Sequence, residues 1–478
     1  MTSLSLDIAH SLPEIVLALG ALSLLMLGAF GAGKRDWIIT EAAIVVLGIA
    51  FLSMFYPIAD KALVWDQAFI DDNFARFMKT LVLLGSMTTL ILSREYMARL
   101  GIDLFEFPVL VLLATLGMCM LVSAQSLIAL YLGLELMSLA LYVIAAFHRD
   151  DVRASEAGLK YFVLGALSSG MLLYGSSLIY GYAGTVSFTG IAAALQGGVS
   201  IGVIFGLVFV LAGLAFKMSI VPFHMWTPDV YEGAPTPVTT FFATAAKVAA
   251  VAITIRIIVT AFPGVKPQWQ QIIVFVSILS MALGAFGAIG QTNIKRLMAY
   301  SSIGHMGFAL VGLSTGTEQG VAGVMIYMAI YVLMSLGAFA AILSMRIGDR
   351  YVENIGDLAG LARTNGFMAF VIAMVMFSLA GIPPLAGFFA KWYVFLAAIN
   401  GGLYGLAVIG MLASTVAAFY YLRVIKIMYF DEPARPFDRV NWEVTAVMAA
   451  MGLIVVLFAI FPGPFVAASA QAAAKSLF

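Results

Sequence analysis

Long apolar runs separated by short polar stretches dominate the sequence. A run of about twenty apolar residues is long enough, as a helix, to cross the hydrocarbon core of a membrane. Fourteen such runs occur, at 12–30, 38–56, 75–92, 107–122, 126–147, 156–181, 202–230, 238–260, 271–290, 297–314, 320–346, 366–398, 403–428 and 441–462. The pattern therefore predicts an all-α membrane protein with about 14 transmembrane helices.

The composition supports this fold class and excludes several functions. Of 478 residues, 63% are hydrophobic and 10% are charged, whereas a soluble domain carries about 25% charged residues. The 25 basic residues balance the 25 acidic ones, so no excess of positive charge indicates nucleic-acid binding. Cys119 is the only cysteine, which excludes an internal disulfide and a cysteine-ligated iron–sulfur cluster. Four scattered histidines without an HExxH motif do not predict a metal site.

The loops between the runs give the orientation. Fifteen of the 25 basic residues lie in odd-numbered loops and four lie inside runs. The remaining six, on the opposite side, are Lys61, Arg76, Lys79, Arg256, Lys266 and Lys475. The positive-inside rule then places the odd loops in the cytoplasm and both termini in the periplasm of a bacterial inner membrane. No basic n-region precedes the first run, so we expect it to be a retained helix and not a cleaved signal.

Two runs, 202–230 and 366–398, are too long for a simple span, and each contains a helix breaker. Pro222 interrupts the first run, and Pro383 and Pro384 interrupt the second. Proline removes a backbone donor and clashes with the preceding turn, so we expect both helices to be discontinuous at membrane depth. Breaks at corresponding positions of two halves indicate a transport site.

The spacing of these features predicts an internal repeat. Pro222 and Pro383 lie 161 positions apart, and Glu135 and His305 lie 170 apart. This spacing matches a five-helix unit, and an odd number of helices places the second copy in inverted topology. We therefore expect N-terminal helices in 1–105, a first repeat in 106–262, a second in 268–430 and a C-terminal helix in 431–478.

Five charged residues are predicted at membrane depth: Glu135, Lys160, Lys217, Lys247 and Lys391. Each charge costs about 2.5–3.5 kcal/mol or more at the centre of a transmembrane helix, so such residues are functional candidates by default. Burial disfavours the charged form of a lysine, and a nearby carboxylate favours it. A lysine held between these two effects can take up and release a proton, which makes a switchable proton site.

A structural alternative stands beside each functional interpretation. Glu135 either tunes Lys217 or neutralises a structural lysine, and Lys217 either carries a proton or satisfies the carbonyls of the broken helix. Lys247 is too deep to extend to the membrane surface, which favours function. Lys391 and Lys160 lie nearer to the helix ends, where a side chain reaching the surface is the alternative to a proton-carrying role.

Two histidines are secondary candidates because imidazole titrates near neutral pH and can relay protons. His224 follows the first break, where its alternative role is to bond the interrupted backbone. His305 lies in mid-span between the two breaks, with Ser301 and Ser302 adding polarity beside it. We expect His305 to relay protons between lysines.

Two long motifs carry a family resemblance. One runs from Lys217 to Thr239 (KMSIVPFHMWTPDVYEGAPTPVT) and is followed by Lys247; the other runs from Asn293 to Gly307 (NIKRLMAYSSIGHMG). Together they resemble the signatures of the proton-conducting membrane subunits shared by respiratory complex I and Mrp antiporters. The glutamate segment from Tyr131 to Tyr142 (YLGLELMSLALY), the lysine after the second break and the end of the chain after fourteen runs are most similar to a complex I branch of that family.

The resemblance implies a site and a division of labour. It implies a central proton axis of Glu135, Lys217, Lys247 and Lys391, with His305 between the last two and Lys160 serving the cytoplasmic half-channel. It also implies that NADH, FMN, the iron–sulfur clusters and quinone reside on other subunits, so this chain holds no cofactor. The expected partners are the other membrane subunits of complex I and lipid, with no nucleic acid.

Three other functions remain open from the sequence. The same lysines would serve a subunit of a multi-subunit Mrp-type cation/proton antiporter, which is driven by ion gradients. A chain inside complex I could also be an assembly scaffold that moves no protons. The related membrane hydrogenases are disfavoured only by the glutamate segment.

Overall fold

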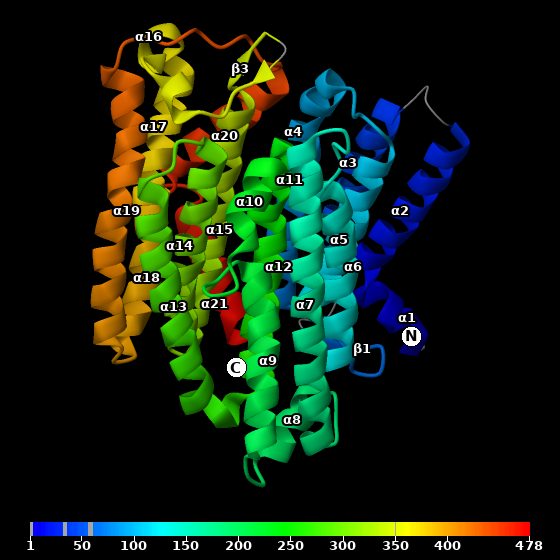
Figure 1. Cartoon of the computed structure of the whole chain (residues 1–478). Coiled ribbons are helices and arrows are strands. Elements are labelled where there is room, and N and C mark those ends of the chain that lie inside the picture. Colours follow the sequence, from blue (N-terminus) through cyan, green and yellow to red (C-terminus); the bar gives the residue numbers. More distant parts are fainter. Residues whose placement is uncertain (1–2, 32–35, 56–60, 349) are drawn as a thin grey trace.

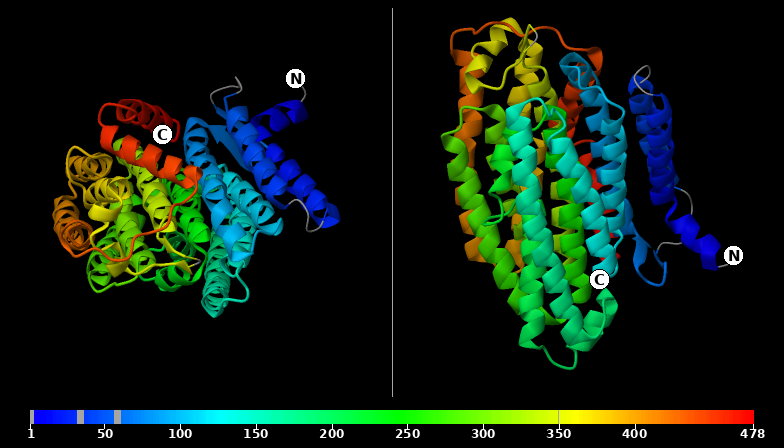
Figure 2. Two further views of the ribbon diagram at one scale, coloured as in Figure 1. Left: turned by 90° about the horizontal axis from the view of Figure 1, so that it is seen from above. Right: turned by 45° about the vertical axis from the view of Figure 1, so that its right-hand side comes forward.

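The computed structural model describes residues 3–31, 36–55, 61–348 and 350–478, and these form an elongated bundle of helices (Figure 1). The N-terminal part contains α1 (Ser3–His10), α2 (Leu12–Gly31), α3 (Asp36–Ser53), β1 (Lys61–Val64), β2 (Phe69–Asp72) and α4 (Asn73–Leu100). Strands β1 and β2 pair antiparallel as a hairpin. The figures place α1, α2 and α3 at one edge of the bundle (Figure 2).

The middle of the chain supplies eight elements. They are α5 (Glu106–Val122), α6 (Leu127–Ala145), α7 (Val152–Ala183), α8 (Phe188–Leu195), α9 (Ile201–Met218), α10 (Trp226–Gly233), α11 (Thr236–Phe241) and α12 (Lys247–Ala261). A π-helical turn, η1 (Phe242–Ala246), joins α11 to α12. The expected interruption is present, because α9 ends before Pro222 and α10 begins after it.

The remaining chain also consists mainly of helices, one of which is interrupted. It contains η2 (Pro263–Val265), α13 (Lys266–Ile289), α14 (Ile294–Leu313), α15 (Glu318–Leu343), β3 (Arg346–Ile347), β4 (Arg350–Tyr351), η3 (Ile355–Leu358), α16 (Leu361–Thr364), α17 (Gly366–Ala380), α18 (Ala386–Asn400), α19 (Tyr404–Phe430), α20 (Trp442–Leu457) and α21 (Gly463–Lys475). The second predicted interruption separates α17 from α18 at Pro383 and Pro384. Within the described ranges, nine helices are long and apolar enough to cross a membrane, and five more apolar helices are shorter.

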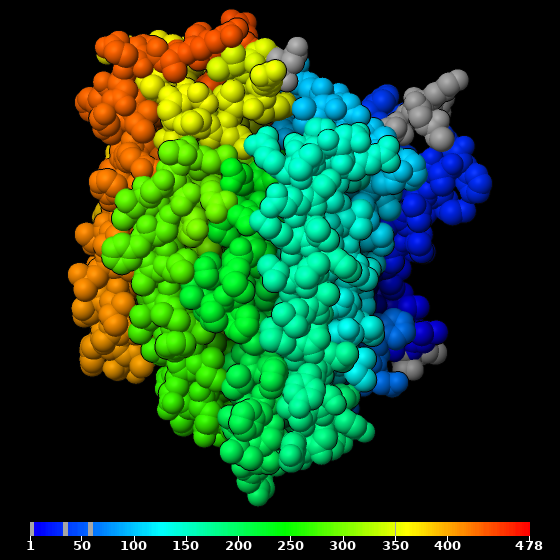
Figure 3. Space-filling view, viewed as in Figure 1, coloured from blue at the N-terminus to red at the C-terminus, as the bar shows by residue number. Residues whose placement is uncertain are grey.

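Burial divides the helices into an inner and an outer set. In the apolar 18-residue stretch of each span, 94% of the residues are buried at 236–261 and at 318–343, but only 28% in α2 and 39% in each of α7 and α19. Outer surfaces carry many exposed apolar side chains, such as Leu167, Phe205 and Leu412. Figure 3 shows one face of the molecule, where the segment of α7 lies beside that of α9. An apolar exterior around a packed interior is the arrangement that a membrane requires.

One buried ion pair joins the N-terminal helices to the interior. Arg256 on α12 donates from Nη1 and Nη2 to the two carboxylate oxygens of Asp72, at 2.9 Å each, and from Nε to the carbonyl of Val122 at 3.0 Å. Both side chains are fully buried. Asp72 also caps α4 by accepting from the backbone N–H of Ala75 at 2.7 Å. The pair therefore fixes α4, α5 and α12 at one point.

Two residues correct the sequence prediction. Arg256 and Lys79 were counted among the basic residues of the periplasmic side, but both are buried inside the protein, on α12 and α4. Lys79 pairs with Glu14 of α2, with 2.6 Å between Nζ and Oε1. A count of loop charges fails here because each cation is buried against a carboxylate from another segment, which removes the cost that the count assumes.

Removing one member of the Arg256–Asp72 pair should destabilise the protein strongly. Asp72→Asn keeps the capping acceptor but leaves a buried guanidinium without its counter-charge, at a cost of about 3–5 kcal/mol. We expect a clear fall in the thermal unfolding midpoint of the purified assembly, and Asp72→Asn/Arg256→Met should recover most of it. The exposed pair Lys426–Asp431 is the control, because its removal should change stability by no more than about 1 kcal/mol. Equal shifts for the two pairs would contradict this account.

Candidate functional site

The first broken helix places Lys217 beside its carbonyl end. Lys217 is the penultimate residue of α9, which ends at Met218, and Ser219 continues in the left-handed region with φ 62°. The Lys217 Nζ donates to Tyr142 Oη at 3.0 Å and lies 4.9 Å from the centre of that ring. A cation at this end is favoured by the helix dipole and by the faces of aromatic rings.

Glu135 lies in the same region, two helical turns before Tyr142 on α6. Its carboxylate interacts electrostatically with Lys217. Its Oε1 is buried and makes no hydrogen bond with the described residues. The structure thus brings together the acid and the lysine that the sequence paired, while the direct contact of Lys217 is a neutral hydroxyl.

Lys247 reaches into the first break from the next span. Its Nζ donates to the carbonyl of Met218 at 3.2 Å and lies 5.9 Å from the centre of the Tyr231 ring. The π-helical turn η1 ends immediately before Lys247. A π turn closes one more residue in its hydrogen-bonded ring than an α turn does, so it rotates the direction of the side chains that follow. Lys247 is buried and its ammonium meets neutral groups.

Lys391 has the same relation to the second break. Its Nζ donates to the carbonyl of Ala380 at 2.8 Å, to that of Leu379 at 3.2 Å and to Ser414 Oγ at 2.7 Å. Gly381 follows with φ 91°, and a Cβ there would lie 2.9 Å from Lys391 Cδ. Each break therefore exposes carbonyls at the end of a half-helix, and a buried lysine binds them.

His305 connects the two regions. It lies on α14 and is buried. Its Nδ1 is 2.6 Å from Tyr327 Oη, and its Nε2 is 3.2 Å from Tyr421 Oη. His305 also interacts electrostatically with both Lys391 and Lys247.

Two candidates lie apart from this row. Lys160, expected at membrane depth, has a side chain that is 42% exposed and forms ion pairs with Glu156 at 2.7 Å and Asp229 at 2.8 Å. The reason is the length of α7, whose 32 residues extend for about 48 Å, well beyond a hydrocarbon core of about 30 Å. His224 lies in the first break, where its Nδ1 is buried without a hydrogen-bond partner among the described residues.

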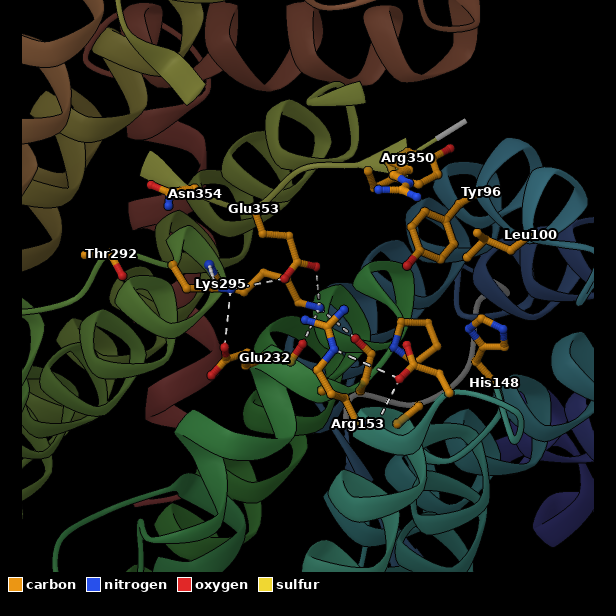
Figure 4. Close-up of a pocket in the computed structure, with 17 residues that line it drawn as sticks. Tyr96, Leu100, His148, Arg153, Glu232, Thr292, Lys295, Arg350, Glu353 and Asn354 are labelled. Atoms are coloured by element: carbon orange, nitrogen blue, oxygen red, sulfur yellow. Dashed lines mark hydrogen bonds and ion pairs between the residues drawn. The ribbon is translucent and has the colours of Figure 1, made fainter. Parts of the chain in front are cut away.

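A polar pocket opens where the two halves of the chain meet (Figure 4). Its volume is about 540 Å³, and its wall includes His148, Arg153, Glu232, Lys295 and Glu353. Lys295, expected in a loop, is buried at its edge and donates to the carbonyls of Glu232 and Ala234 and to Glu353 Oε1, at 2.8, 2.7 and 3.1 Å. The pocket lies near β3 and β4, at the opposite end of the bundle from α1 and β1.

The sequence prediction missed the neutral partners of the lysines. Tyr142, Ser414, Tyr327 and Tyr421 contact the candidate residues, yet nothing in their composition distinguishes them from packing residues. Tyr142 carried one usable signal, since a residue seven positions after Glu135 shares its helix face. No such spacing connects Ser414 with Lys391, because these two lie on separate helices.

Comparison with known proteins assigns the fold and the motifs to one family. The family model described as the membrane (TM) region of NADH:quinone oxidoreductase/Mrp antiporter proteins matches residues 124–417. The chain belongs to this family. That range contains all seven candidate residues and both broken helices.

Several family members resemble the chain over its whole length. It is 68% identical to NADH-quinone oxidoreductase subunit N of Beijerinckia indica over 478 residues, covering 100% of both chains. It is 60% identical to subunit N of Parvibaculum lavamentivorans, covering 98% of this chain and 97% of that one. A chain of respiratory complex I from Thermus thermophilus is 32% identical with TM-score 0.80, covering 96% and 99%. A chain of the Mrp complex from Dietzia shares the fold, with 23% identity and TM-score 0.87 over 100% and 98%.

The Ser414 hydroxyl should contribute measurably to stability through Lys391. Ser414→Ala removes the shortest of the three hydrogen bonds of a buried ammonium, and a hydrogen bond to a charged group contributes about 1.5–3 kcal/mol. We expect the thermal unfolding midpoint of the purified assembly to fall. The matched control is Thr415→Ala, because the neighbouring Thr415 is exposed and bonds only its own helix at Met411. A Ser414 variant as stable as the Thr415 variant would show that Lys391 does not depend on this contact.

Proposed function

We propose that this chain is the proton-translocating membrane subunit N of respiratory complex I. The observation that carries the proposal is the row of Lys217, Lys247 and Lys391, each buried beside a helix break, in a chain 68% identical along its full length to a subunit N. The driving reaction, quinone reduction by NADH, takes place elsewhere in the complex. NADH, FMN, the iron–sulfur clusters and quinone belong to other subunits, and within the described ranges no group of three His, Cys, Asp or Glu residues could hold a metal.

The contacts of the lysines suit proton transfer better than permanent charge storage. A carboxylate next to a buried ammonium stabilises the protonated lysine strongly, whereas neutral carbonyls and hydroxyls stabilise it less. Met218, Ala380, Ser414 and Tyr142 supply such neutral acceptors. Movement of the Glu135 carboxylate toward Lys217 favours its ammonium, and movement away favours release of the proton.

The remaining candidates extend the row in both directions. His305 relays protons between Lys247 and Lys391 through a ring whose two nitrogens already meet tyrosine hydroxyls. Lys160 and Asp229 form the cytoplasmic approach, since their exposed ion pair joins α7 to α10 just beyond the first break. His224, inside that break, is a further acceptor near Lys217.

The proposed topology is that of 14 spans with both termini in the periplasm. Spans four to eight (106–262) and nine to thirteen (268–430) form inverted repeats, each with one broken helix, after N-terminal helices in 1–105 and before a last span in 431–478. The partners are the other membrane subunits of complex I, and lipid covers the apolar exterior. Two of the similar solved structures are complex I from Thermus thermophilus, which supports this assignment.

Charge-removing variants test the pumping role directly. We expect Lys217→Met and Lys247→Met each to reduce proton pumping and coupled NADH:quinone activity several-fold, because the row loses a proton carrier. NADH oxidation by an artificial acceptor should continue, and co-purification of the variant chain with the NADH-oxidising subunits shows that the complex assembles. Pumping is measured in inverted membrane vesicles, and Lys426→Met, an exposed lysine on α19, is the matched control. Full pumping in both variants would contradict proton translocation by this chain and favour the assembly-scaffold function.

The similarity to a chain of the Mrp complex supports a second candidate function, that of a cation/proton antiporter subunit. A subunit of a cation/proton antiporter would use the same lysines but respond to ion gradients. Expression in a strain without sodium/proton antiporters separates the two. Restored sodium tolerance, without co-purification of a flavin- and iron–sulfur-bearing NADH dehydrogenase, would overturn the complex I assignment.

The orientation has a test of its own. The single native cysteine, Cys119, is buried, so single introduced cysteines report their own side of the membrane. We expect Asp150→Cys to react with an impermeant maleimide only from the cytoplasm, and Gly197→Cys only from the periplasm. Both positions are exposed. Labelling of the two from the same side would contradict the proposed topology.

A further inference from the structure

A second buried titratable cluster lies in the N-terminal helices, outside the residues matched by the family model. Its centre is the ion pair between Glu14 on α2 and Lys79 on α4, whose side chains are 7% and 2% exposed. Apart from this pair, the Glu14 carboxylate makes no hydrogen bond with the described residues. Nothing in the proposed proton row uses these two groups.

The cluster continues toward the end of the bundle that carries α1 and β1. His10, at the end of α1, has its Nδ1 2.8 Å from Asp71 Oδ2, and Arg76 donates to the same carboxylate. An Nδ1–H that donates to Asp71 leaves Nε2 as a proton acceptor. That Nε2 is buried and has no partner among the described residues.

A small cavity connects the imidazole with the ion pair. His10, Asp71, Arg76 and Lys79 all border it, and its volume is about 10 Å³. This is room for about one water molecule, which could bridge His10 Nε2 and Lys79 Nζ. A titratable pair, a free acceptor nitrogen and space for one water therefore occur together.

A line of polar side chains leads from this cluster toward Lys247. Cys119 is fully buried on α5, and α5 packs against both α2 and α4. One helical turn before it, Thr115 donates to Ser86 of α4 at 2.8 Å. The neighbouring Gly85 packs against η1, where a Cβ on Gly85 would be in ordinary contact, at 3.5 Å, with Thr244 Oγ1, three residues before Lys247. Hydroxyl side chains hydrogen-bond across the interfaces of transmembrane helices, and here they join the region of Glu14 and Lys79 to that of Lys247.

We propose that Glu14 and Lys79 form a second proton-exchange site, which passes protons between the Lys247 region and the periplasm through His10. This inference rests on the proposed pumping function and adds an outlet to it. A proton that arrives along the seam protonates the Glu14 carboxylate. Lys79 then gives one proton through the bridging water to His10 Nε2, and Glu14 returns its proton to the Lys79 amine. The imidazolium releases the Nε2 proton to the periplasm, so one proton crosses and the pair regains its original charges.

The sharpest test is His10→Asn. The asparagine amide can still donate to Asp71 from the position of Nδ1, but it offers nothing at the position of Nε2. We expect an assembled complex with normal NADH oxidation by an artificial acceptor and a several-fold lower number of protons pumped per NADH in inverted vesicles. His10→Asn with the wild-type ratio would overturn the proposal.

A paired variant separates this role from a purely structural one. Glu14→Gln/Lys79→Met removes both charges together, so no unpaired charge remains buried. A structural pair predicts that this variant assembles and pumps normally, whereas an exchange site predicts assembly with a several-fold lower ratio. The matched control is Arg94→Met/Glu41→Gln/Glu443→Gln, which removes together all three charges of a partly exposed ion cluster that ties α4 to α3 and α20.

The outcomes distinguish this inference from the function on which it rests. Loss of pumping in Lys217→Met together with normal pumping in His10→Asn and the paired variant would reject the outlet and retain the pump. Normal pumping in Lys217→Met and Lys247→Met would reject the pump itself. If the paired variant fails to assemble, His10→Asn alone decides.

Discussion

Every backbone carbonyl inside a membrane must find a donor, and this requirement organises the centre of the molecule. A continuous helix satisfies its own carbonyls, but a broken one exposes those of its last turn to an apolar interior. Here the ends of α9 and α17 are bound by ammonium groups from Lys247 and Lys391. The ammonium groups supply donors to the buried carbonyls, and the carbonyls supply acceptors to the buried ammonium groups. Each therefore offsets the cost of burying the other.

In this arrangement the row of Lys217, Lys247 and Lys391 is stabilised in the interior, yet its lysines can lose a proton. The acceptors are dipoles and not full charges, so loss of a proton from either lysine leaves a neutral amine that can still bond its surroundings. The aromatic hydroxyls around Lys217 and His305 act in the same way. A change in the position of Glu135 can then shift the balance without first breaking a strong ion pair.

The sequence predicted the helices and the breaks because both depend on local chemistry. Apolar runs of sufficient length specify spans, and α9 and α17 end three to four residues before the prolines that interrupt them, as a clash with the preceding turn requires. Lys217, Lys247, Lys391 and Glu135 were found because a charge inside an apolar run is conspicuous.

The rest depended on contacts between distant segments. The sequence prediction placed three basic residues outside the protein interior: Lys79, Arg256 and Lys295. A basic residue near the end of an apolar run cannot be distinguished from a loop residue by sequence, and only the fold shows the carboxylate beside it. For Lys160, where a position at the surface and a role in proton entry were both open, the fold adds the ion pairs with Glu156 and Asp229 on a helix longer than a membrane span. Hydrophobic length does not report how far a helix extends into water.

The Arg256–Asp72 pair also constrains how this fold can be shortened in evolution. A lineage that discarded the N-terminal helices would lose Asp72 and leave a fully buried guanidinium with one carbonyl, from Val122, as its remaining partner. Deletion and replacement of the arginine would therefore have to occur together, or the replacement first. Any shortened relative that lacks Asp72 should carry an uncharged residue at the position of Arg256.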